Sequence, residues 1–198
     1  SQTPTPAPQP TGFYYADMLG HWGEYSSIKL AENHALIGEQ IENKFYFYPN
    51  KLMTRSDFLL LINSAIGYAN LPDADPYFRF ADDDSIPLWL KGPAYKAHTA
   101  GLISGSLQPD GTITFEPFRP INRIETMVML NNAMKPEVPS EIELDFEDLD
   151  IIPLWSRQYI KNVEGYGLVK GYDDNTLRPF KTVSKVESAE MAYQLMKY

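Results

Sequence analysis

The stretch KLMTRSDFLLLINSAIGYAN (51–70) has the pattern of a buried helix with an explicit start. Thr54 is a favoured N-cap residue and Asp57 lies three positions later, a capping-box pattern in which cap side chain and acid satisfy backbone donors reciprocally. Residues 58–62 are apolar on nearly every side, so we expect this helix to lie centrally. Arg55 is less expected, because the positive end of the helix macrodipole disfavours a cation in the first turn.

The chain repeats this pattern three times. Ile-Pro-Leu-Trp occurs at 86–89 and at 152–155, each time after a Phe-x-Asp, and a looser relative, YADMLGHW, begins at Tyr15. Each tryptophan is followed by a small-residue and aliphatic cluster, a polar turn, a proline and a helix start. Agreement at this many points predicts tandem structural units. We expect a Pro/Thr-rich linker followed by three repeats, at residues 1–12, 13–72, 73–138 and 139–198.

Each repeat is expected to form a helix, a loop and a second helix. The N-cap and the acid of the second helix recur in every repeat, as Thr54 with Asp57, Asn122 with Glu125, and Ser184 with Glu187. A unit of about 60 residues is marginal alone, so mutual burial of the second helices would stabilise all three. The sequence therefore predicts a mainly α fold, with three tandem helix–loop–helix repeats around a central three-helix core. Approximate three-fold symmetry further predicts up to three similar clefts between neighbouring repeats.

A basic residue follows each of these N-caps: Arg55, Arg123 and Lys185. Because the helix dipole disfavours a cation there, its recurrence indicates a role outside the helix. One interpretation is an ion pair within the chain, with Asp17, Asp82 or Asp148. The other is an anion site, because free N–H groups at a helix start and a guanidinium can together grip a carboxylate. Lysine lacks the guanidinium fork, so the third site would be weaker or different.

Two interpretations also apply to the tryptophans, Trp22, Trp89 and Trp155. Packing in the core is the more common fate of a tryptophan. A flat aromatic face can instead stack on the apolar face of a sugar ring. Partial exposure at a cleft would therefore fit a saccharide ligand.

The order of these features resembles the S-layer homology domain, a family in which three consecutive copies are usual. The resemblance covers about residues 13–198, and the family's Thr-Arg-Ala-Glu motif appears as TRSD (54–57), NRIE (122–125) and SKVE (184–187). It implies a bacterial surface protein, located at the cell wall or S-layer, whose repeats form a three-pronged, pseudo-three-fold spindle. It also implies non-covalent anchoring to the peptidoglycan-linked secondary cell wall polysaccharide, often through pyruvylated N-acetylmannosamine. The basic residue of each repeat would hold the pyruvyl carboxylate.

Composition excludes several other classes of protein. The net charge of −9 argues against general nucleic-acid binding, which needs a basic surface. Cysteine is absent, which excludes disulfides, thiolate zinc sites and cysteine nucleophiles. No apolar run approaches the roughly 20 residues of a membrane span.

The first stretch, SQTPTPAPQPTG (1–12), is rich in proline and threonine and has no apolar pattern. It is typical of an extended linker, the alternative being a disordered terminus. A linker implies a covalently attached neighbouring domain on its N-terminal side. No signal peptide is visible; for a secreted protein we expect that segment to have been removed or to lie outside this sequence.

Catalysis and metal binding find little support. The acidic run 73–84 could hold a glycosidase pair, but it connects two repeats, where a solvated charge run is the usual interpretation. The histidines, His21, His34 and His98, share no metal-ligand spacing. The segment 108–116 resembles part of an EF-hand calcium loop. Aligning Gly111 with loop position 6 puts Ser106 at position 1 and Pro117 at position 12, where a carboxylate is needed, so the segment does not fit a calcium site. We therefore expect a non-catalytic module without a cofactor; the alternative is a structural surface module that mediates subunit or lattice contacts.

Overall fold

The computed structural model describes residues 12–198, and the predicted linker at 1–12 lies almost wholly outside this range. The described chain is mainly helical, which confirms the predicted fold class. Its α-helices are α1 (Glu24–Glu32), α2 (Arg55–Ile66), α3 (Leu88–Thr99), α4 (Arg123–Met134), α5 (Arg157–Gly165) and α6 (Lys185–Lys197). Short 3₁₀ turns are η1 (Tyr68–Asn70), η2 (Asp83–Ser85), η3 (Leu149–Ile151) and η4 (Leu154–Ser156).

Short hairpins replace part of the expected loops. In the first repeat β1 (Glu39–Ile41) pairs antiparallel with β2 (Lys44–Tyr46), and in the second β3 (Ser106–Leu107) pairs with β4 (Ile113–Thr114). In the third repeat Tyr172 N donates to Thr176 O over 2.9 Å, which closes the corresponding turn. These pairings are too short to show a period-2 pattern in the sequence.

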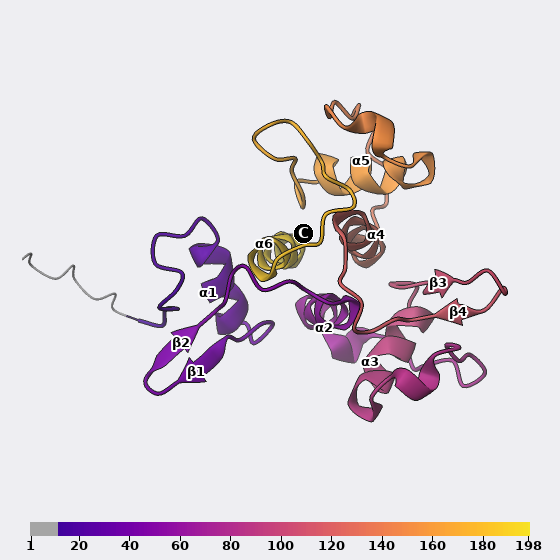
Figure 1. Ribbon diagram of the computed structural model, residues 1–198, viewed down its shortest axis with the longest axis horizontal. Coiled ribbons are helices and arrows are strands. Elements are labelled where there is room, and N and C mark those ends of the chain that lie inside the picture. Colours follow the sequence, from indigo (N-terminus) through magenta and orange to yellow (C-terminus); the bar gives the residue numbers. More distant parts are fainter. Residues whose placement is uncertain (1–11) are drawn as a thin grey trace, which may run out of the picture.

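The second helices, α2, α4 and α6, lie side by side at the centre, and the other elements project outward in three groups (Figure 1). Each of the three begins with a capping box. The first helix of each repeat packs on the second helix of the preceding repeat: α3 on α2, α5 on α4, and α1 on α6. The packed units are therefore shared between repeats, and the third repeat closes back onto the first.

A ring of backbone hydrogen bonds joins the segments that precede the three central helices. Met53 N donates to Val183 O over 3.1 Å, and Val183 N donates to Ile121 O over 3.1 Å. Ile121 N completes the ring by donating to Met53 O over 3.0 Å. Because each bond links a different pair of repeats, the ring fixes all three helix starts relative to one another.

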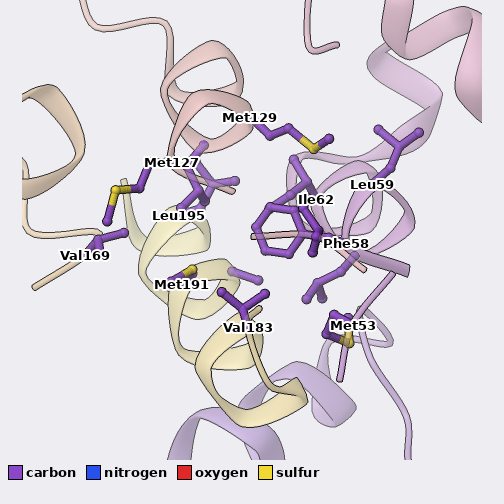
Figure 2. Packing of buried hydrophobic residues seen from close by; sticks show 14 of the residues in the cluster. Met53, Phe58, Leu59, Ile62, Met127, Met129, Val169, Val183, Met191 and Leu195 are labelled. Atoms are coloured by element: carbon purple, nitrogen blue, oxygen red, sulfur yellow. The ribbon is translucent and has the colours of Figure 1, made fainter. Parts of the chain in front are cut away.

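The core between the central helices is apolar. Phe58 and Ile62 from α2 lie beside Met129 from α4 and Leu195 from α6 (Figure 2). Phe58 is fully buried and Ile62 is 1% exposed. The expectation that the middle of this helix lies centrally is thus confirmed, because an all-round apolar helix is stable only where neighbours cover every side.

His98 on α3 supplies a pH-dependent contribution to stability. Its ring stacks on Phe78 with 3.6 Å between the ring centres, and burial lowers the pKa of His98 below its usual value. Asp75 is the one charged group that opposes this shift. As the pH falls through about 6.5, the unfolded chain therefore takes up a proton that the folded chain resists.

We expect the free energy of unfolding to decrease between about pH 7.5 and about pH 5.5, and His98→Phe to reduce that decrease. Urea unfolding of both proteins at the two pH values measures it. The same pH dependence in the two proteins would contradict this assignment.

Among the described residues, no helix is long and apolar enough to cross a membrane.

Candidate functional site

Arg55, at the start of α2, reaches across to the second repeat. Its side chain is buried, Nε donates to Phe115 O over 2.9 Å, and Nη1 lies 3.0 Å from Oε1 of Glu125. Burial lowers the pKa of Arg55, and the charge of Glu125 opposes that shift. The guanidinium stays charged, since arginine does not deprotonate in proteins.

A cavity of about 300 Å³ opens beside this guanidinium. It is lined by residues of all three repeats: Arg55, residues 102–106, Glu125, Val128, Met129, Trp155 and Tyr159. We call it the first cleft. It combines a cation, a carboxylate and two aromatic side chains, the usual means of orienting a polar ligand within an apolar pocket.

Arg123, at the start of α4, occupies the corresponding place against the third repeat. It is buried, and Nη2 donates to Lys170 O. The centre of its guanidinium lies 4.7 Å from the ring centre of Tyr172, a cation–π contact. Its Nε is buried without a hydrogen-bond partner, and within residues 12–198 Arg123 is in none of the ion pairs. We call the region of Arg123, Tyr172, Arg178 and Lys181 the second cleft.

Lys185, at the start of α6, faces the first repeat. Its Nζ lies 4.7 Å from the ring centre of Phe47, and burial lowers the pKa of this lysine. A cavity of about 520 Å³ lies on the same lobe, lined by Asp17, Glu39, Tyr48, Pro49, Asn50 and Lys51. Lys185 N donates to Lys51 O over 2.7 Å, which ties the helix start to this cavity. We call this region the third cleft.

The expectation of free backbone donors at the helix starts is wrong. At α2, Arg55 N donates to Arg119 O over 3.0 Å and Ser56 N donates to Pro117 O over 2.9 Å. The third donor, Asp57 N, bonds the side chain of Thr54. The starts of α4 and α6 are satisfied in the same way. An anion in these clefts must therefore be held by side chains.

The proposed ion pairs with Asp17, Asp82 and Asp148 are also wrong. Each aspartate accepts two backbone N–H groups from the segment that precedes the repeat's proline, at 2.7–2.8 Å. Arg55 pairs with Glu125 instead. The aspartates hold the lobes in shape, and none of them is in the described ion pairs. At longer range, the charges of Asp148 and Asp17 oppose the fall in pKa that burial causes at Arg123 and Lys185.

Asp82→Ala tests this structural role. The change leaves the N–H groups of Phe115 and Glu116 without their acceptors. We expect the free energy of unfolding to fall by about 1–3 kcal/mol, the usual cost of an unsatisfied polar group. Urea unfolding measures it, with Asp84→Ala, at an exposed neighbouring aspartate, as the control. Equal effects of the two substitutions would refute the assigned role.

The tryptophans do not lie in the core. Trp22, Trp89 and Trp155 are 63%, 62% and 64% exposed. Residues close to Trp89 in sequence are buried instead, since Ile86 and Leu90 are 2% and 0% exposed. Trp155 lines the first cleft together with Arg55, so two of the predicted site residues meet in one cavity although they are distant in sequence.

Sequence reasoning missed a second basic residue in every repeat. Lys51, Arg119 and Lys181 each lie four positions before the predicted one. Arg119 Nη2 is 2.6 Å from Oε1 of Glu125, and Lys181 Nζ is 2.8 Å from Oε1 of Glu187. The constant four-residue offset is visible in the aligned repeats and could have revealed them.

Comparison with known proteins identifies relatives of this chain. Residues 145–187 match the sequence model of the S-layer homology domain. An S-layer protein of Bacillus thuringiensis subsp. finitimus is 28% identical over 86% of this chain and 20% of its own length. An amylopullulanase of Thermoanaerobacterium thermosulfurigenes is 25% identical over 92% of this chain and 9% of its own length. A cellulosome-anchoring protein of Acetivibrio thermocellus is 24% identical over 73% of this chain and 33% of its own length.

The chain thus spans at most a third of the length of these relatives, whose names give them different roles. What they share with it is the segment that contains the repeats. The match to the S-layer homology domain thus lies at residues 145–187, within the third repeat, and the relatives align over most of the chain.

Proposed function

We propose that this chain is a non-catalytic anchoring module that binds an anionic secondary cell wall polysaccharide in clefts between its repeats. The ligand would carry pyruvylated N-acetylmannosamine units. The observation that carries the proposal is the buried basic residue at the start of each central helix, which in the first cleft lines one cavity with an exposed tryptophan of another repeat. The corresponding basic residues, Arg123 and Lys185, are buried at the starts of α4 and α6.

The chemistry of the clefts fits an acidic sugar. Arginine binds a carboxylate with charge-assisted hydrogen bonds, and the tryptophan offers a flat face to the sugar ring. The whole chain carries a net charge of −9, so an anionic ligand depends on these local cations.

The relatives support an extracellular location, at the bacterial cell wall or S-layer. One is named an S-layer protein, one a cellulosome-anchoring protein and one a cell surface glycoprotein. A shared anchor also explains why an amylopullulanase matches over only 9% of its length. A further domain would then be tethered through the Pro/Thr-rich segment.

The alternative of a contact module is favoured by the exposed leucines beside the tryptophans, since Leu88 and Leu154 are 86% and 78% exposed. Such apolar side chains could contact a neighbouring subunit. Self-association in the absence of glycan would support this role.

Co-sedimentation with purified bacterial walls tests the proposed function. We expect the chain to sediment with walls that retain their pyruvylated polysaccharide and to stay in solution with walls from which it has been stripped. Equal sedimentation with both preparations would refute polysaccharide binding. Depyruvylated walls form the third arm, and loss of binding to them assigns recognition to the carboxylate.

A further inference from the structure

The three clefts carry different charges, because the repeats place different residues at equivalent positions. The residue before each repeat's proline has a left-handed backbone conformation in every case, with φ of 58°, 55° and 55°. This position holds Tyr48 in the first repeat, Glu116 in the second and Arg178 in the third. The repeats thus share a backbone conformation at this position but differ in the charge of the side chain there.

In the first cleft the charges are mutually satisfied. Glu125 accepts from both Arg55 and Arg119, at 3.0 and 2.6 Å, and Glu116 accepts from Nε of Arg119 at 2.8 Å. Two arginines thus face two glutamates. A carboxylate ligand would have to displace one of these glutamates or approach two like charges at close range.

In the third cleft, too, the positive and negative side-chain charges balance. Lys51 lines its cavity together with the carboxylates of Asp17 and Glu39. Lys185 lies nearby, and the charges of Lys51 and Glu39 act on its pKa in opposite directions. Its ammonium is a point charge that cannot grip a carboxylate with a fork.

In the second cleft three cations surround one aromatic ring. The side-chain charges of Arg123, Arg178 and Lys181 lie 4.7, 4.2 and 4.8 Å from the ring centre of Tyr172. Glu187 accepts from Lys181, and Asp174 lies 2.6 Å from Arg178. The charge of Asp148 also acts on Arg123 and Arg178. Among the described ion pairs, however, none includes Arg123. Lys170, exposed beside Gly171, stands where the second repeat has Ser104.

One hydrogen bond in the second cleft is left open. Nε of Arg123 is buried and has no partner, whereas Nε of Arg55 donates to Phe115 O over 2.9 Å. A buried donor without a partner costs free energy, which a bound acceptor recovers. Arg123 is thus a buried cation without an ion-pair partner among the described residues and with an unused Nε donor, while Arg55 pairs with Glu125 and its Nε is satisfied.

We propose that the carboxylate of the wall glycan binds in the second cleft, at Arg123 and Lys181, and that Glu116 and Glu125 hold the first cleft closed to anions. This assignment rests on the proposed function and ranks the clefts by their affinity for the glycan's carboxylate. It follows that Glu125 acts as an internal substitute for the ligand's carboxylate.

Calorimetric titration with a pyruvylated N-acetylmannosamine glycoside tests this ranking on a matched pair. Lys181→Gln and Arg119→Gln change partly exposed residues at the same repeat position. We expect Lys181→Gln to weaken binding about tenfold and Arg119→Gln to change it less than about twofold. Arg123→Gln should abolish binding, with circular dichroism confirming the fold. The reverse order within the matched pair would overturn the ranking while leaving the proposed function intact.

A gain-of-function variant tests the closed first cleft. In Glu125→Gln the amide oxygen can still accept from Asn122 N in the capping box, while the negative charge beside Arg55 and Arg119 is removed. We expect the stoichiometry to rise from about one to about two glycosides per chain. Unchanged stoichiometry in the folded variant would overturn the claim that Glu125 closes this cleft. No binding by the wild-type chain would overturn the ranking and the carboxylate-specific function together.

Discussion

Phe58→Ala is expected to lower the free energy of unfolding by about 3–5 kcal/mol, the usual cost of truncating a large buried aromatic side chain. Phe58 is fully buried, and it lies between α2 and the neighbouring central elements (Figure 2). The site cannot collapse easily, because the backbone ring through Met53, Ile121 and Val183 fixes the three helix starts. Urea unfolding, followed by far-ultraviolet circular dichroism, measures the change.

Leu60→Ala on the same helix is the matched control. Leu60 is only partly buried, so less apolar area is lost, and we expect a change of about 1–2 kcal/mol. Equal losses for the two variants would contradict a core centred on Phe58. Loss of the first repeat alone, with the remainder still folded, would contradict the packing of α1 on α6 and of α3 on α2.

Removal of all three tryptophans is expected to weaken binding to walls by about 100-fold or more, since an anchoring aromatic residue is commonly worth 2 kcal/mol or more. The stability of the chain should change little, because Trp22, Trp89 and Trp155 are each more than half exposed. Wall-binding isotherms and thermal unfolding of the triple alanine variant provide the two readouts.

Tyr77→Ala controls for the loss of an exposed aromatic side chain. Tyr77 is 95% exposed and lines neither of the cavities described above. We expect its removal to leave wall binding unchanged. If the triple variant bound walls as tightly as the wild type, the tryptophans would have no part in recognition. A large fall in the stability of the triple variant would instead indicate that the tryptophans have a structural role.

The local features of the fold could be predicted because their determinants lie close together in sequence. Thr54 and Asp57 are three residues apart, and the apolar run that follows them is continuous. These short-range signals are sufficient to predict the start of a helix and its burial. The same signals recur in α4 and α6, which made the mainly α class predictable.

The contacts of the site could not be predicted, because they join residues far apart in the chain. Arg55 and Glu125 are separated by 70 positions, and their pairing depends on the second repeat lying against the start of α2. The carbonyls of Pro117 and Arg119 occupy the donors that an isolated helix would leave free. Sequence reasoning therefore identified the basic residue correctly as a special position, and assigned it the wrong partners.

The exposure of the tryptophans was harder still to predict, since hydrophobicity alone favours burial. In the Ile-Pro-Leu-Trp motif the proline precedes the first turn of a helix, so the following leucine and tryptophan turn outward. Leu88 and Trp89 are exposed while Ile86 and Leu90 are buried. Within α3 the buried residues Leu90, Ala94 and Ala97 recur at helical spacing, which is the signal that could have placed Trp89 at the surface.

Recognition of the glycan's carboxylate is tested by titrating the wild-type chain with a pyruvylated N-acetylmannosamine glycoside and with its non-pyruvylated twin. Both sugars offer the same ring to the tryptophans, and only the first offers a carboxylate to the arginines. We expect saturable binding of the acidic sugar, weakened by added salt, and at least about tenfold weaker binding of the neutral sugar. Equal affinity for the two sugars, or binding of neither, would contradict this expectation.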